Sequence, residues 1–457
     1  MTREELFLTK KSIYESADEG LVKEIYDFAE GYKVYLDHSR TERLAVREAI
    51  KLAQARGFSP WEDGKSYQPG DKIYYDNRGK ALMLAVIGKE SLSKGANIAA
   101  AHVDNPRLDL KQQPLFEDNE AAYFKTHYYG GIKKYQWLAT PLALVGVIVR
   151  ADGETVDVSI GLEKGEPRFV ITDLLPHLAG DQMKKNAGDF VAGENLSILL
   201  GTRPDAEEGS DRVKLSVMKL LNEKYGIVEA DFLSAELSAV PADDVCDVGL
   251  DRSLIGGYGH DDRVCVYAEV MAILDMEAPE KTAVCLLADK EEVGSQGVSG
   301  MVSQAFDRFM ESLCRMQGVN LYTCFANSFC LSADVCNAFD PLYPEVSDRR
   351  NNARLNYGVG IMKFTGARGK SGSNDASAEV VGRVRRMLDG EGIAWQMGEL
   401  GKVDQGGGGT VASITAQRDI DTIDAGVPVL SMHAPFEVIS KADLYMTYRA
   451  MKALYES

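Results

Sequence analysis

Short apolar runs that alternate with helical segments constrain this chain most strongly. The runs read AVCLLAD at 283–289, FCLSAD at 329–334 and VPVLSMH at 427–433. Around them lie the helical segments DRVCVYAEVMAILDM, SNDASAEVVGRVRRML and KADLYMTYRAMKALY. Strands that alternate with helices are typical of a parallel or mixed sheet with helices on both faces. We therefore expect an α/β fold, with a mixed, mostly parallel sheet sandwiched by helices.

The first part of the chain carries the same patterns, and a different pattern follows it. Thr41 begins an amphipathic helix, TERLAVREAIKLAQARG, which Gly57 ends, and strands are expected at 81–87 and 97–102. From residue 105 onward, strand-like runs such as LALVGVIV and TVDVSIGL alternate with the turn ADGE and the polar stretch RPDAEEGSDR. A length of 457 residues favours two domains. We expect one α/β domain from residues 1–104 and 247–457, interrupted by a β-rich domain at 105–246.

Composition limits the partners and the compartment. The formal net charge of -18 argues against nucleic acid and anionic membranes as partners. The start MTREELFLTKK lacks a signal-peptide core, and the runs ALMLAVIG and PLALVGVIV are too short to span a bilayer. The 7 cysteines are odd in number and contain no CxxC pair, which disfavours disulfides and thiolate zinc sites. We expect buried, reduced cysteines and a cytoplasmic protein.

Acidic and imidazole side chains follow four of the apolar runs, namely AAAHVD, VCLLADKEE, CLSAD and PVLSMH. In open α/β sheets, ligands bind beyond the carboxyl ends of the strands, so these side chains can converge. A fifth cluster, GHDDR at 259–263, precedes a helix. Together these segments supply His102, Asp104, Asp261, Asp262, Glu291, Glu292, Asp334 and His433.

Carboxylates and imidazoles without thiolates suit zinc, manganese or cobalt. Two divalent ions about 3.5–4 Å apart need a bridging carboxylate and terminal ligands, and hydrolysis needs a further carboxylate as general base. Each motif alone has an ordinary explanation: a core histidine, an acidic helix start or an Asp N-cap. However, two of only 6 histidines end apolar runs, and acids end the others. This coincidence favours a two-metal site.

The motifs AHVDNPRLDLK, ADKEEVGSQG, CLSADVCNA, VDQGGGGTVA and LSMHAPFEV occur in this order, after FAEGYKVYLDHSRTERLAV. In these motifs the chain resembles metallopeptidase family eighteen, the family of aspartyl aminopeptidase and vacuolar aminopeptidase I in clan MH. The resemblance covers nearly the whole chain. It implies a zinc-peptidase-like proteolytic domain interrupted by a dimerisation domain, an aminopeptidase acting on peptides, and a tetrahedral homododecamer built from dimers.

The resemblance also implies roles for the site residues. Two divalent ions, most simply zinc with cobalt or manganese as alternatives, would be held by His102, Asp261, Glu292, Asp334 and His433. Asp104 would orient His102, and Glu291 would be the general base. Asp261 would bridge the ions, so Asp262 is not expected to be a ligand. A cis peptide bond is expected between Asp261 and Asp262.

Substrate contacts are less constrained. His177 in LLPHLAGDQM matches a segment that reaches a partner subunit's active site in relatives, although a structural loop histidine is an equal alternative. Lys370, Gly407 and Gly408 are candidates to line the substrate pocket, with a flexible turn as the alternative for the glycines. Gly180 and Asp181 follow PHLA, where aspartyl aminopeptidases have a histidine-rich PHLAIH-type segment. This difference favours neutral or hydrophobic N-terminal residues over acidic ones.

Other functions remain open at this stage. A clan relative could instead be a dipeptidase, carboxypeptidase or deacylase, which would not require a free α-amine. Outside the enzymes, the alternative is a structural shell protein that binds metal and catalyses no reaction. Such a protein needs no general base, so the presence of Glu291 argues against it.

Overall fold

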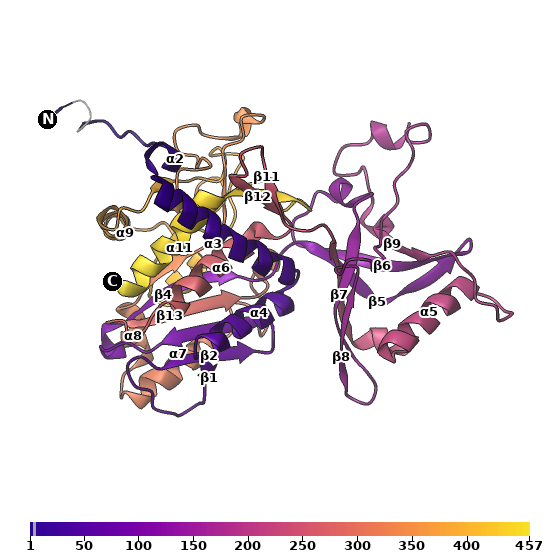
Figure 1. The fold of residues 1–457 in the computed structure, drawn as a ribbon, viewed down its shortest axis with the longest axis horizontal. Helices are drawn as coiled ribbons and strands as arrows, with labels where there is room; N and C mark the ends of the chain where they lie inside the picture. The colour runs from indigo at the N-terminus through magenta and orange to yellow at the C-terminus, as the bar shows by residue number, and fades with distance from the viewer. Residues whose placement is uncertain (3–5) are drawn as a thin grey trace. The chain divides into compact units, whose positions relative to one another are not determined.

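The structure is a computed structural model that describes residues 1–2 and 6–457. The chain divides into two compact units (Figure 1). Unit 1 comprises Met1–Asp104, Val245–Met432 and Glu437–Ser457, and unit 2 comprises Asn105–Asp244 and His433–Phe436. No helix in the described part of the chain is both long and apolar enough to cross a membrane.

Unit 1 is built on a nine-stranded mixed sheet. In spatial order its strands are β1 (Ser59–Pro60), β2 (Lys72–Asn77), β3 (Ala81–Val86), β13 (Thr282–Ala288), β4 (Ala96–His102), β14 (Phe329–Ser332), β18 (Asp421–Gly426), β16 (Val359–Met362) and β17 (Trp395–Met397). The central strands β13, β4, β14 and β18 are parallel, whereas β3 and β16 run antiparallel to their inner neighbours. The expected α/β fold with a mixed, mostly parallel sheet is confirmed.

Helices cover both faces of this sheet, because alternate strand residues face opposite sides. Leu82 and Leu84 of β3 belong to one apolar core, and Met83 and Ala85 belong to the other. The first core includes α3 (Glu19–His38), α4 (Glu42–Ala55), α6 (His260–Leu274), α9 (Ala378–Gly390) and α11 (Lys441–Glu456). The second includes α7 (Ala305–Met316), α8 (Leu321–Ala326) and α10 (Ala412–Ala416). A short helix, α2 (Ile13–Ser16), precedes α3.

The predicted helix after Thr41 is α4. The Thr41 hydroxyl accepts a hydrogen bond from Leu44 N at 3.4 Å, which satisfies one of the free amides of the first turn. Gly57 has a φ of 85° just after the helix, a left-handed conformation that glycine adopts without steric cost.

A second, five-stranded sheet of unit 1 corrects one expectation. Its order is β11 (Cys246–Val248), β12 (Leu254–Gly257), β20 (Glu437–Ser440), β19 (Pro428–Leu430) and β15 (Cys336–Asn337). We expected the run VPVLSMH to end at the same sheet edge as β4, β13 and β14; this is wrong. β18 takes that place, and β19 joins the second sheet.

Gly426 explains how one segment of the chain supplies two sheets. A Cβ atom there would lie 1.7 Å from the carbonyl oxygen of Asp334, so only glycine lets the backbone pass this close as it leaves the first sheet. The hydrophobic pattern gives no warning of the change, because the apolar run begins only after Gly426 and the two aspartates of β18 (DTIDAG) hide the strand that stays in the first sheet.

Unit 2 is β-rich. Its six-stranded antiparallel sheet has the order β8 (Thr155–Ile160), β7 (Leu142–Val149), β10 (Ala235–Pro241), β5 (Arg107–Asp118), β6 (Ala121–Tyr129) and β9 (Ser197–Gly201). The helix α5 (Arg212–Tyr225) packs against β5, β6 and β9 (Figure 1).

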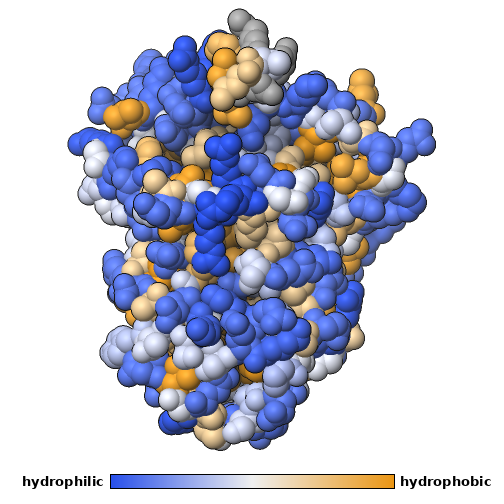
Figure 2. All heavy atoms as spheres, turned by 90° about the vertical axis from the view of Figure 1, so that its left-hand side faces the viewer, coloured by the Kyte–Doolittle hydropathy of each residue, from blue (hydrophilic) through white to orange (hydrophobic). Residues whose placement is uncertain are grey.

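Hydrophilic side chains predominate on the face drawn in Figure 2, with apolar ones scattered singly or in small groups. Scattered apolar residues are normal on a protein surface and mark no docking site by themselves. This face therefore carries no extended apolar patch.

Candidate metal centre

The predicted site residues gather at the carboxyl ends of three neighbouring strands. His102 is the last residue of β4 and pairs with Ala288 at the end of β13. Asp334 follows the end of β14, which is the neighbour of β4 on the other side. Glu291 and Glu292 lie in a 3₁₀ turn, η6 (Glu291–Val293), that follows β13. The sheet therefore brings together residues that are far apart in sequence.

Asp261 joins the group from the first turn of α6. Its Oδ1 atom lies 3.2 Å from Nε2 of His102, and Oδ1 of Asp334 lies 3.9 Å from the same nitrogen. The Asp261–Asp262 peptide bond is cis, as the resemblance implies. The backbone N–H of Asp261 donates to the carboxylate of Glu437 at 3.0 Å, which fixes the start of the helix.

Three overlapping groups of residues could each hold a metal ion. Within each group, one possible ligand atom from every residue lies within 4.8 Å of the others. The groups are His102 with Asp261 and Glu292, His102 with Glu291 and Asp334, and Asp261 with Asp262 and Asp334. Because the groups share His102, Asp261 and Asp334, they form one cluster of possible metal ligands. Oxygen and imidazole donors of this kind suit zinc, manganese and cobalt.

Asp104 connects the two halves of this cluster. Its backbone oxygen lies 3.0 Å from Nδ1 of His102, and its Oδ1 atom lies 3.4 Å from the same nitrogen. Its carboxylate accepts hydrogen bonds from Glu291 N at 3.0 Å and from Glu292 N at 3.2 Å. One buried carboxylate thus orients the imidazole and holds the turn that carries both glutamates.

The cluster is a buried concentration of negative charge. Burial raises the pKa values of Asp262 and Asp334 well above normal, and neighbouring carboxylates raise them further. Burial by itself lowers the pKa of His102, but its bonds to Asp104 and Asp261 outweigh this effect and raise the pKa well above 6.5. Among the described residues, Asp262 Oδ1 has no hydrogen-bond partner. Buried carboxylates of this kind are paired or bind metals, so the residues fit divalent cations.

Comparison with known proteins identifies the chain. The family described as "Aminopeptidase I zinc metalloprotease (M18)" matches residues 35–455. The chain belongs to the M18 family. It is accordingly a metalloaminopeptidase, a hydrolase of a zinc-dependent family.

Relatives of this M18 aminopeptidase match it along their whole length. The "Probable M18 family aminopeptidase 1" of Clostridium acetobutylicum is 47% identical over 453 residues, which is 97% of each chain. The crystal structure of the M18 aminopeptidase from Thermotoga maritima has a TM-score of 0.95 at 43% identity and covers 98% of this chain and 100% of its own. The structure of aminopeptidase I from C. acetobutylicum has a TM-score of 0.91 at 43% identity and covers 99% and 100%.

For three of the predicted residues of this M18 chain, the structure describes other surroundings within their own units. His433 belongs to unit 2, where its Nδ1 atom lies 2.8 Å from the carbonyl oxygen of Gly131. His177 lies in an exposed turn of unit 2. Lys370 of unit 1 pairs with Asp375 at 2.9 Å and lies over the ring of Phe364. The roles of these three residues stay predictions.

The glycine-rich loop at 406–409 is more tightly packed than a flexible turn. A Cβ atom on Gly406 would lie 1.5 Å from Leu400 O, and one on Gly407 would lie 2.0 Å from Gly366 O. Gly408 accepts a hydrogen bond from Gly366 N at 2.6 Å. Close backbone approach, rather than mobility, therefore requires glycine at 406 and 407.

Sequence reasoning missed two buried acids of unit 1. Glu437 of β20 accepts the backbone hydrogen bond of Asp261, and Asp424 of β18 accepts one from Thr410 Oγ1 at 2.8 Å. Both are fully or almost fully buried. The signal that could have found them is an acid inside an apolar strand, in TIDAG and FEVIS.

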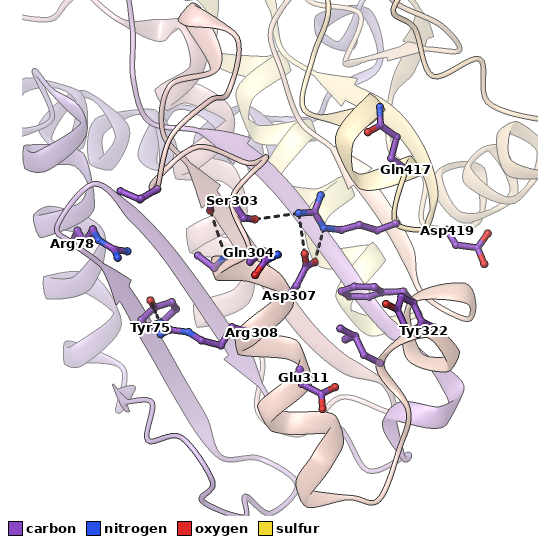
Figure 3. Close-up of a pocket in the computed structure, with 15 residues that line it drawn as sticks. Tyr75, Arg78, Ser303, Gln304, Asp307, Arg308, Glu311, Tyr322, Gln417 and Asp419 are labelled. Carbon is purple, nitrogen blue, oxygen red and sulfur yellow. Dashed lines mark hydrogen bonds and ion pairs between the residues drawn. The ribbon is translucent and has the colours of Figure 1, made fainter.

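A separate cavity of about 720 Å³ in unit 1 contains none of the predicted site residues (Figure 3). It is lined by Tyr75 of β2, Arg308 of α7, Tyr322 of α8 and residues just after α10. At its edge, Arg418 Nε donates to Asp307 at 2.6 Å. The chemistry that the sequence predicts is therefore not in this cavity.

Proposed function

We propose that this M18 chain removes N-terminal residues from peptides with two divalent ions, most simply zinc, with cobalt or manganese as alternatives. The proposed ligands are His102, Asp261, Glu292, Asp334 and His433. The observation that carries the proposal is the position of Asp261 and Asp334 within 3.2 and 3.9 Å of the same imidazole nitrogen. Glu291 lies beside them in the turn that Asp104 holds.

The proposed mechanism assigns proton transfer to Glu291. Divalent ions, when bound, polarise the peptide carbonyl and lower the pKa of water. Glu291 accepts a proton from the attacking water as the new C–O bond forms at the N-terminal residue. It then returns the proton to the leaving amine as the C–N bond breaks. The carboxylate of Asp104 keeps Glu291 in place by accepting a hydrogen bond from the backbone amide of Glu291.

We propose neutral or hydrophobic N-terminal residues as substrates, with aspartyl or glutamyl peptides as the alternative. Support comes from Gly180 and Asp181, which replace the histidine-rich segment of aspartyl aminopeptidases. His177 remains a candidate substrate contact. Lys370, Gly407 and Gly408 remain weaker candidates, because their contacts within unit 1 already explain them.

A substrate screen tests the proposal. The metal-stripped protein is reloaded with zinc, cobalt or manganese and assayed on chromogenic leucyl, alanyl, aspartyl and glutamyl amides, with N-acetylated forms as controls. Unblocked neutral substrates should be cleaved and acetylated ones should not. Glu291→Gln should abolish turnover while the bound metal per chain stays that of the wild type. Cleavage of the acetylated forms, or full activity of Glu291→Gln, would overturn the proposal.

Assembly and location are further expectations. We propose a homo-oligomer, with a tetrahedral dodecamer built from dimers as its form. The similarly folded mApe1 of S. cerevisiae, 20% identical with a TM-score of 0.77, is a dodecamer. A cytoplasmic location is supported by free cysteines, of which all but Cys246 are buried. Light scattering of the purified chain tests the oligomer.

A further inference from the structure

Asp424 is a buried carboxyl group that the proposed mechanism does not use. It lies in β18 and is 0% exposed. In the sheet it pairs with Ser332 of β14, which pairs with Ala100 of β4. His102 and Asp334 follow Ala100 and Ser332 by two residues. Because residues two apart face the same side of a strand, Asp424 lies one row below the proposed metal ligands.

The surroundings of Asp424 compensate its charge only in part. Its Oδ1 atom accepts a hydrogen bond from Thr410 Oγ1 at 2.8 Å, whereas Oδ2 has no hydrogen-bond partner in the described chain. Burial raises the pKa of Asp424 to about 7; the bond from Thr410 and the neighbouring side chain of Ser332 act in the opposite direction, and the charge of Glu291 adds to the increase. The strand register places this carboxyl group next to β14, whose end leads into Asp334. A buried polar group costs free energy unless it is satisfied, which points to a specific role for the bond to Thr410.

Thr410 is the point where the glycine-rich loop enters α10. It directly follows Gly406–409, and its Oγ1 atom also accepts from Ala412 N at 3.3 Å in the first turn of α10. Gly406 and Gly407 pack against the backbone of Leu400 and Gly366, so the first half of the glycine run is held. The hydroxyl of Thr410 links the end of this loop to Asp424 in the sheet.

The other end of α10 has its own anchor. Beyond α10, Arg418 donates to Asp307 at 2.6 Å and to the carbonyl oxygens of Met301 and Ser303 at 3.2 and 3.3 Å, at the edge of the cavity in Figure 3. Asp424 and Asp307 therefore fix opposite ends of the same short helix. Only the Asp424 end is joined to the central strands that lead to His102 and Asp334.

We propose that Asp424 is a positioning residue of the peptidase site: through Thr410 it holds the end of the loop 404–410 near the strand ends that carry His102 and Asp334, where the loop backbone forms a wall that receives the peptide substrate. The inference rests on the proposed function. Gly406 N and Gly408 O are already bonded within the chain. The other backbone groups of the loop suit the main chain of a peptide, which presents complementary donors and acceptors. Asp424 itself does not touch the substrate.

Three variants test the proposal on a neutral aminoacyl amide and on a longer peptide. Thr410→Val removes the hydroxyl at nearly constant volume, Thr410→Ser restores it, and Asp307→Asn loosens the far end of α10 as a matched control. In Thr410→Val we expect KM to rise roughly tenfold with kcat within about threefold, because uniform substrate binding is lost rather than chemistry. Amide hydrogen exchange of residues 404–411 should accelerate, and metal content should stay that of the wild type.

Thr410→Ser should recover the wild-type KM, and Asp307→Asn should leave KM unchanged. Asp424→Ala provides a second route to the same defect, should Thr410→Val fold poorly. An unchanged KM in Thr410→Val, a loss confined to kcat, or an equal rise of KM in Asp307→Asn would overturn the inference. A wild-type protein that cleaves no unblocked substrate would instead overturn the proposed function.

Discussion

The carboxylate of Asp104 accepts a hydrogen bond from the backbone N–H of Glu291 at 3.0 Å. The same side chain accepts from Glu292 N, and the backbone oxygen of Asp104 lies against the ring of His102. The resemblance to M18 peptidases assigned Asp104 only to His102. In the structure it also determines where the turn with both glutamates lies, so its loss should disturb proton transfer and metal binding together.

Asp104→Asn should lower activity and metal affinity on the order of 10–100-fold, the usual cost of losing a group that orients a metal ligand. The amide nitrogen of asparagine cannot accept, so only one of the two backbone bonds can persist. Steady-state kinetics and competition with a chelating dye measure the two effects.

Asp71→Asn is the matched control for this variant. Asp71 likewise accepts a backbone hydrogen bond, from Gln68 N at 2.7 Å, in an exposed turn before β2. It should retain wild-type kinetics. If Asp104→Asn kept wild-type kinetics and metal affinity, as expected for Asp71→Asn, the hydrogen bonds of Asp104 would not contribute to activity or to metal binding.

Binding of divalent ions should stabilise the fold strongly, because it neutralises buried carboxylates. A ligand at 100 times its Kd adds about 2.7 kcal/mol to the free energy of unfolding. Zinc added to the metal-stripped protein should therefore raise the Tm of the wild type and of the surface variant Glu456→Gln equally. Asp334→Asn should show a much smaller rise in calorimetry. An equal zinc response in all three proteins would place the ions elsewhere.

The sequence predicted the core of the site because simple rules apply there. β4, β13 and β14 are uninterrupted apolar runs, and parallel strands bring their carboxyl ends to one sheet edge. Thr41 and Gly57 mark the ends of α4 by their capping chemistry. These features depend on residue type and spacing, which one sequence contains.

The errors arose where tertiary contacts decide. The run VPVLSMH was expected to end at the edge of the main sheet, but at Gly426, which lies close to Asp334, the chain leaves for the second sheet, and the main-sheet strand β18 precedes the run. Asp424 and Glu437 read as isolated acids, since their partners Thr410 and Asp261 are far away in sequence. The four glycines read as a flexible turn because their packing partners, Leu400 and Gly366, are not visible in the pattern.

The glycine-rich loop should tolerate alanine at one position and not at others. Gly406→Ala would place a Cβ atom 1.5 Å from Leu400 O, and Gly407→Ala would place one 2.0 Å from Gly366 O at a φ of 121°. Gly409 has no heavy atom within 4 Å of an added Cβ. We expect Gly406→Ala and Gly407→Ala to lower Tm and raise KM, and Gly409→Ala to keep the Tm of the wild type. Equal tolerance at all three positions would show that the loop is not packed as described.

The free energy of unfolding should fall as the pH rises, because the buried carboxyl group of Asp443 then tends to lose its proton. This side chain is fully buried in the first turn of α11 and accepts backbone hydrogen bonds from Asn356 and Gly358, each at 2.7 Å. Burial raises its pKa to about 8 even though these bonds act to lower it. The folded chain therefore keeps a proton that the unfolded chain, with a carboxyl pKa of 3.8, has released. This contribution to stability is complete below about pH 4 and is lost as the pH rises towards 8.

Asp443→Asn isolates this effect, because the amide cannot ionise. Thermal unfolding of both proteins at pH 5 and pH 8.5 should show the wild type losing stability relative to the variant as the pH rises. A constant difference in Tm between the two proteins would mean that Asp443 is ionised in the folded state throughout.

Tyr32 should contribute to stability through its bond to His260, the residue before Asp261. Its hydroxyl lies 2.7 Å from Nδ1 of His260, and both side chains are fully buried. Tyr32→Phe leaves that nitrogen without its partner, at a cost of about 1–3 kcal/mol in the free energy of unfolding. Tyr35→Phe, one turn further along α3, is the control: Tyr35 donates to Ala45 O at 3.3 Å, within α4. A helical carbonyl already accepts a backbone hydrogen bond, so this variant should lose less stability. Urea unfolding of the two variants measures the difference, and equal losses would assign the effect to the packing of the rings rather than to the bond with His260.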